Sequence, residues 1–228
     1  MGFFKNLFGN VFDSENVNQN EQSSKNENNV KAKFPEELQL QIVLNMLSVA
    51  ELLEITKKYE LKAHHWNLIA NSYKQFQEYY LAEKAYLQAI ELDPTNEEPY
   101  GNLMALYLTT NNYSNYENIY SAGMANANPR SYIVLKDGLY QYKHKKNYDM
   151  AHSAALSVLT AKKMQDEDAF ILAVSALFSW GLECENQNEG YDKFMEGIEM
   201  LRRGLIVFPN SEHLNTIKSQ YAEFFTED

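Results

Sequence analysis

The 228-residue chain has little of what disulfide scaffolds, sheets and membrane spans are built from. Its one cysteine, Cys184, excludes an internal disulfide framework and fits a reducing compartment. Five prolines and nine glycines are too few for a large sheet with many turns. No stretch approaches the roughly 20 apolar residues of a membrane-spanning helix. These absences favour a soluble helical protein.

Cations are also scarce, since 20 Lys and Arg stand against 31 Asp and Glu for a formal net charge of −11. This balance opposes binding of nucleic acid or of an anionic membrane by the body of the protein. The chain has no Gly-rich phosphate loop, GxSxG elbow or HExxH pair. The adjacent His64 and His65 are expected to point to different sides of a helix, so they cannot bind one metal ion. We expect a protein that is not an enzyme and that needs no cofactor and no metal.

The N-terminal residues 1–12 are amphipathic. Three roles stay open for them: an interfacial membrane anchor, a helix that docks in a partner's groove, or a helix that packs on its own domain. Because Lys5 is their only Lys or Arg, we expect weak or no membrane contact. Residues 13–33 hold six Asn and no aromatic residue, which predicts a disordered linker. The apolar residues that fall on one face of the first segment are Phe3, Phe4, Leu7, Phe8, Val11 and Phe12.

A regular repeat begins at Trp66. Eight bulky or small positions from there to Ala89 recur 34 residues later, and Pro94 follows the first copy. That period, with a leading Trp, small–aromatic–small spacing and a closing Pro, resembles the tetratricopeptide repeat. In this family each unit is a helix–turn–helix, and stacked units form a concave binding surface. The positions of the first copy are Trp66, Ile69, Ala70, Tyr73, Tyr79, Ala82, Tyr86 and Ala89.

The resemblance implies an all-α fold, a right-handed α-solenoid of stacked helix–turn–helix repeats. Ser48 and Glu51 form a capping box that predicts a helix start, and Ala82 should face neighbouring helices. The third repeat is offset by 35 because Pro129 arrives one residue late. The fourth has surplus residues, so either its first helix is lengthened or a loop is inserted. The expected parts are capping helices (34–62), repeats (63–96, 97–131, 132–165 and 166–210) and a C-terminal helix (211–228).

The resemblance also places a peptide-binding groove along the first helix of each repeat. Asn71 and Asn102 match the two amide positions with which some family members clamp the C-terminal carboxylate of heat-shock chaperones. The clamp's basic positions are filled by Asn67, Ile133 and Asp137, so most of that clamp is missing. The implied groove residues are His64, Asn67, Asn71 and Lys74 in the first repeat, Asn102 and Ala105 in the second, Lys136, Tyr140, Lys143 and His144 in the third, and Phe170, Val174 and Leu177 in the fourth.

Two functions follow. The first is a non-catalytic adaptor or chaperone in the cytoplasm that holds a partner's peptide segment, of acidic character, in its groove. An acidic stack of a few such repeats is similar to bacterial type III secretion chaperones. The alternative is an assembly scaffold that residues 1–12 tether peripherally to the inner membrane.

Overall fold

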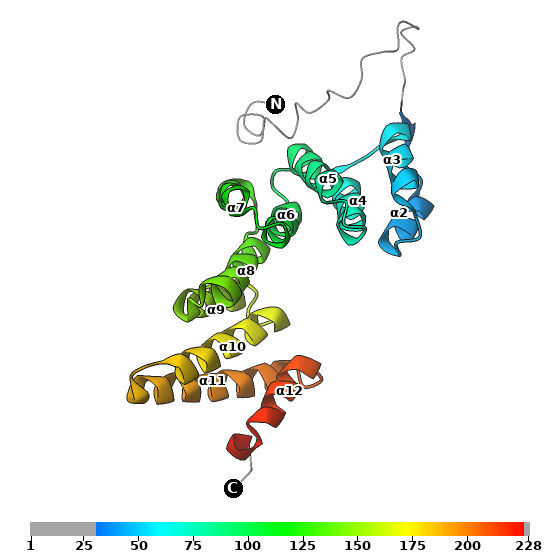
Figure 1. Cartoon of the computed structure of the whole chain (residues 1–228). Coiled ribbons are helices and arrows are strands. Elements are labelled where there is room, and N and C mark those ends of the chain that lie inside the picture. Colours follow the sequence, from blue (N-terminus) through cyan, green and yellow to red (C-terminus); the bar gives the residue numbers. More distant parts are fainter. Residues whose placement is uncertain (1–30, 226–228) are drawn as a thin grey trace, which may run out of the picture. The chain divides into compact units, whose positions relative to one another are not determined.

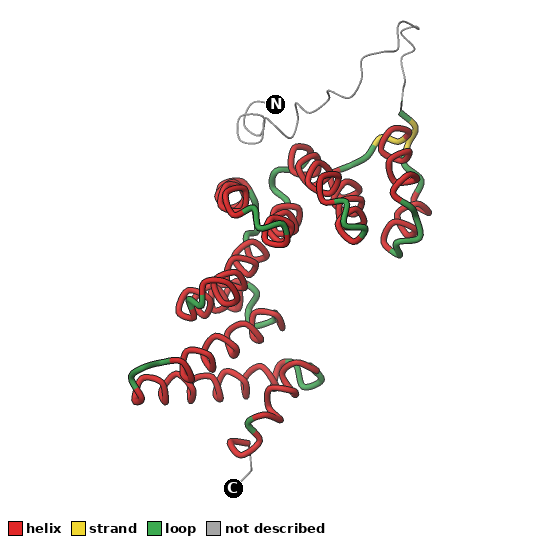
Figure 2. Tube along the Cα trace, viewed as in Figure 1, coloured by secondary structure: helices red, strands yellow, loops and turns green. Residues whose placement is uncertain are grey.

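The computed structural model describes residues 31–225. The amphipathic segment 1–12 and most of the expected linker lie outside the described residues. Within them the chain is helical apart from one short pair of strands, which confirms the all-α class (Figures 1 and 2). Chain contacts divide the protein into two compact units, residues 1–129 and 130–228. The handedness of the repeat stack stays a prediction.

The first unit starts with a short parallel ladder between β1 (Ala32–Lys33) and β2 (Tyr59–Glu60). Lys31 donates from Nζ to the Thr56 carbonyl oxygen at 2.9 Å. Phe34 is buried, and its ring centroid lies 4.3 Å from that of His65. The expected linker reached residue 33, and its last two residues, Ala32 and Lys33, pair with β2.

Two capping helices follow, α2 (Glu36–Val43) and α3 (Val49–Lys58). The predicted capping box is confirmed: Ser48 Oγ accepts from the Glu51 N–H, and the Glu51 carboxylate accepts from the Ser48 N–H. α2 packs on the first repeat, where Ser72 donates to the Ile42 carbonyl oxygen at 3.2 Å. Large apolar side chains near α2 that stay exposed are Leu40, Val43, Leu44 and Met46.

Two helix pairs then form the first two repeats. Ala82 and Ala89 are fully buried, as the small positions of the repeat predicted. Pro94 follows the first pair two residues after its last helix ends. Each second helix packs against the first helix of its own pair (Figure 1). The helices are α4 (Ala63–Gln75), α5 (Tyr79–Leu92), α6 (Glu97–Thr109) and α7 (Tyr113–Asn126).

The turn between the two helices of a repeat has the same conformation in three successive repeats. Gln77, Asn111 and Lys146 have left-handed backbones, with φ of 62°, 55° and 51°. After the first two, the next N–H donates to a carbonyl five residues earlier, at 2.9 Å from Glu78 and 2.8 Å from Asn112. This bond is the Schellman arrangement that satisfies helix-end carbonyls. The turn therefore accepts different side chains, since its geometry comes from the backbone.

The second unit contains one extra residue, in the π-helical turn that continues its first helix. α4, α6 and α8 (Ser131–Tyr140) start 34 residues apart, so the expected shift at Pro129 is wrong. α9 (Tyr148–Ala161) starts 35 residues after α7, because a π-helical turn, η1 (Gln141–Lys145), follows α8. A π-turn contains one residue more than the α-turn it replaces.

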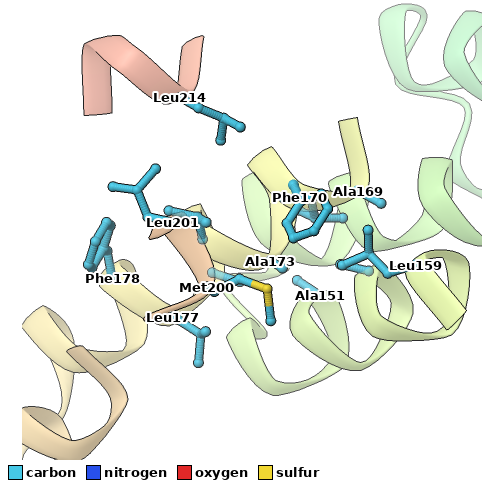
Figure 3. Packing of buried hydrophobic residues seen from close by; sticks show 14 of the residues in the cluster. Ala151, Leu159, Ala169, Phe170, Ala173, Leu177, Phe178, Met200, Leu201 and Leu214 are labelled. Carbon is cyan, nitrogen blue, oxygen red and sulfur yellow. The ribbon is translucent and has the colours of Figure 1, made fainter. Parts of the chain in front are cut away.

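The fourth repeat has lengthened helices and no long inserted loop, which settles the two alternatives. α10 (Glu167–Glu183) and α11 (Gln187–Val207) have 17 and 21 residues and run alongside each other (Figure 1). A Cβ on Gly190 would lie 2.7 Å from the Gly181 oxygen, so two glycines permit their close approach. α12 (Glu212–Gln220) and η2 (Ala222–Phe225) end the unit. Buried side chains from α8 to α12 form its core (Figure 3).

Candidate functional site

Four of the predicted contacts lie on one face of α4, because their spacing of three or four residues matches the helical turn. His64 is exposed, Asn71 and Lys74 are half-buried, and Asn67 is only 4% exposed. The apolar side chains of α4, such as Ile69 and Tyr73, are buried. The first helix of the first repeat thus keeps a polar face.

That face is joined to the next repeat through amide hydrogen bonds. Asn102 of α6 donates from Nδ2 to Oδ1 of Asn67 at 3.1 Å, and Asn67 donates from Nδ2 to Glu98 at 3.3 Å. Tyr86 of α5 donates its hydroxyl to Oδ1 of Asn71 at 2.6 Å. Asn67 therefore acts as a link between two first helices. The Nδ2 group of Asn71 is the part of that amide that can donate to a partner.

The histidine pair differs from the expectation. The rings of His64 and His65 are in contact, with centroids 3.9 Å apart, so they do not point to different sides. His65 is buried between this ring and Phe34, and its Nδ1 accepts from the Lys62 N–H at 3.1 Å. Burial, followed by the charges of His64 and Lys62, lowers the pKa of His65 to about 4. A neutral His65 therefore belongs to the structure of the α4 N-terminus.

The predicted contacts of the third repeat lie in the second unit. Lys136 is half-buried, with Nζ 4.8 Å from the Tyr132 ring centroid. Lys143 is exposed, whereas Tyr140 is only 7% exposed and packs its ring 5.5 Å from that of His144. Lys136 and Lys143 can reach a partner directly, and Tyr140 supports the helix between them. That all these residues line one concavity with α4 stays a prediction.

The groove positions predicted for the fourth repeat are wrong. Phe170, Val174 and Leu177 are at most 1% exposed and belong to the core cluster (Figure 3). The partly exposed positions are the next residues, Ile171 and Ser175. The predicted positions lie 34 residues after Lys136, Tyr140 and Lys143, whereas α10 starts 36 residues after α8, so the earlier period does not carry over to the fourth repeat.

A basic and aromatic cavity in the second unit was missed. It is a shallow pocket, largely open to solvent, with a volume of about 440 Å³, and it is lined by the end of η1, the start of α9 and the last turn of α10. The run 143–146, three lysines and one histidine in an acidic chain, was the sequence signal that could have found it. The lining residues are Lys145, Lys146, Asn147, Tyr148, Asp149 and Trp180.

Hydrogen bonds and cation–π contacts hold this cavity together. Lys146 Nζ lies 3.3 Å from a Glu183 carboxylate oxygen, and Tyr148 is also bonded to Glu183. The Tyr148 bond, more than the lysine, lowers the pKa of Glu183, and burial together with Glu183 raises the pKa of Tyr148 to about 12. Lys193 of α11 places Nζ 4.7 Å from the centroid of the Trp180 ring. The cavity therefore combines ammonium groups with aromatic faces.

The described residues give no sign of a metal centre or of a membrane span. Among them no three His, Cys, Asp or Glu side chains gather closely enough to hold a metal ion. In the same part of the chain, every helix is too short or too polar to cross a bilayer.

No protein-family model matches the chain, and no curated protein matches it in sequence. Among solved structures it is similar to the crystal structure of PilW, described as a widely conserved type IV pilus biogenesis factor. The identity is 16% and the TM-score 0.48, over 79% of this chain and 95% of that chain. A likeness of this degree does not extend to function.

Proposed function

We propose that the chain is a non-catalytic protein-interaction module, an adaptor or chaperone of the cytoplasm, whose first helices hold a peptide segment of a partner. The observation that carries this proposal is the polar face of α4, where His64 is exposed and Asn71 and Lys74 are half-buried. A helix whose inner face was needed only for packing would bury apolar side chains there. Side chains that stay polar and partly exposed on the first helices of successive repeats are suited instead to binding a peptide segment of a partner.

The chemistry of these side chains favours an extended, acidic segment. The Nδ2 group of Asn71 can donate to a peptide carbonyl, and Lys74 one turn away can attract a carboxylate. Lys136 and Lys143 supply the same charge in the second unit. Their attraction for acidic residues is screened by salt, so we expect the affinity to fall as ionic strength rises.

Site-specific photo-crosslinking in the native cell tests the proposal. A photoreactive phenylalanine at Lys74 should capture a partner, whereas the same residue at Glu91, exposed on the second helix α5, should not. Capture is also measured from His64, which is exposed in the first turn of α4. The double variant Lys74→Glu/Lys136→Glu should abolish capture from His64, because it replaces two attractive charges with repulsive ones.

Unchanged capture in that double variant, with unchanged helicity, would show that the lysines do not contribute to a binding groove. Equal capture from Lys74 and Glu91 would count against α4 as the binding face. The membrane-tethered scaffold depends on residues 1–12, which lie outside the described residues, so it stays a prediction. Deleting residues 1–33 and measuring recovery in the membrane fraction separates it from the adaptor.

A further inference from the structure

We propose that the cavity between η1, α9 and α10 is a second binding site, which takes an acidic peptide segment carrying an aromatic side chain. The inference deepens the proposed function, on which it rests, by naming the partner's chemistry and a place in the second unit. It starts from Lys145, Lys146 and Trp180, none of which the groove positions included.

The fold does not require lysines in this turn. Gln77 and Asn111 occupy the same left-handed position as Lys146 in the preceding repeats. Asn is favoured in that conformation over a long side chain such as Lys. Lys163 is left-handed as well, so this conformation alone assigns no function to a lysine, and the turn geometry does not explain why lysines stand at both 145 and 146.

The π-helical turn η1 also supports a binding site at this cavity. The one residue that distinguishes the third repeat from the first two is held in η1, and such turns occur often at functional sites. The Tyr142 hydroxyl lies 3.1 Å from Ser179 Oγ of α10, which fixes η1 beside the helix that carries Trp180. The inserted residue thus lies in the segment that leads directly into the basic wall of the cavity.

The charges favour a peptide over a polyanion of higher charge density. Asp149 lines the cavity and Glu183 is bonded to Lys146, so carboxylates lie among the cations. With a net charge of −11 over the whole chain, these groups would repel a phosphate backbone strongly. A peptide can place single carboxylates near Lys145 and Lys146 and an aromatic ring near Trp180.

Fluorescence of Trp180 in the full chain tests the site. The chain has two tryptophans, so the variant Trp66→Phe leaves Trp180 as the only one. The probe is a blocked nonapeptide with two glutamates near a central phenylalanine and otherwise uncharged residues, and its control has glutamines in place of the two glutamates. We expect saturable quenching by the acidic probe that weakens severalfold between about 50 and 200 mM salt, and at least about tenfold weaker binding of the glutamine probe.

The chain offers a matched control for the lysines. Lys162 and Lys163 are also adjacent and exposed, and Lys163 has a left-handed backbone with φ of 52°. We expect Lys145→Glu/Lys146→Glu to weaken binding at least about tenfold and Lys162→Glu/Lys163→Glu less than about twofold. Isothermal titration of the chain with Trp66 intact repeats the comparison without the fluorescence background.

Equal losses in the two double variants, equal binding of both probes, or no binding would overturn the proposal. Binding of phosphatidylserine vesicles in place of the peptide would overturn it too, by assigning the lysines to a membrane. The failure of the proposed function is distinguishable, because it would abolish crosslinking from Lys74 while leaving peptide binding at Trp180 intact.

Discussion

The contact between Gly181 and Gly190 leads to a prediction whose sign is set by two opposing effects. In an isolated helix, Gly→Ala stabilises by about 1 kcal/mol. In this hairpin, a Cβ on Gly181 would lie 2.7 Å from the Gly190 oxygen and 2.8 Å from the Phe194 nitrogen. Both neighbours are backbone atoms, so the contact can be relieved only by moving α10 and α11 apart.

We expect the packing effect to exceed the helix-propensity effect. Overpacking costs about 1–3 kcal/mol, and separation would also loosen the Phe178–Phe194 ring contact, with centroids 5.0 Å apart. Gly181→Ala and Gly190→Ala should each lower the free energy of unfolding by a net of up to about 2 kcal/mol. The double variant should cost less than the sum by at least about 0.5 kcal/mol, because one separation relieves both contacts.

Urea unfolding followed by circular dichroism measures these changes. Leu182→Ala is the matched control, since Leu182 is adjacent on α10 but 67% exposed, and we expect a change within about 0.5 kcal/mol. Stabilisation of about 1 kcal/mol by Gly181→Ala would refute the close approach, because helix propensity would then be acting alone.

Three further predictions concern the first unit. His65→Gln should remove one part of the pH dependence of stability. The pKa of His65 is about 4 in the folded chain against 6.5 in the unfolded chain, so its neutral ring stabilises above pH 6.5 by at most about 3 kcal/mol. This contribution is lost as the pH falls toward 4. Thermal unfolding of both chains across that window measures the difference. Ala82→Trp should cost about 1–3 kcal/mol in urea unfolding, because this position is fully buried. Tyr107→Phe removes the 2.6 Å hydrogen bond that the tyrosine hydroxyl donates to Glu83, a carboxyl whose pKa is raised by burial. The variant should lower the free energy of unfolding by about 1–3 kcal/mol at about pH 7, and by less at pH values where Glu83 is protonated. Urea unfolding measures both.

The repeat helices were predictable because their signal is local. Ala82 and Ala89 alternate with aromatic residues at helical spacing, and both are buried between helices. Ser48 and Glu51 make the reciprocal bonds that their spacing implies. Such features depend on a few neighbouring residues, so a single sequence contains the information.

The errors arose where a count had to be carried along the chain. The extra residue of the third repeat was assigned to Pro129, whereas the structure holds it in η1. This error arose because no amino-acid composition distinguishes a π-turn from an α-turn. The fourth-repeat positions were counted at the earlier period as well, and they fell on the buried Phe170 and Val174, each next to a partly exposed residue, Ile171 and Ser175.

The cavity at Trp180 was not predictable from position counting, because it depends on parts of three elements. Lys145 and Trp180 are 35 residues apart, and their proximity requires the α8–α10 contact and the π-turn together. A run of cations in the sequence is ordinarily a solvated surface, and only its placement against aromatic side chains distinguishes this one. The insertion that disturbed the repeat count therefore lies in the segment that leads into the cavity.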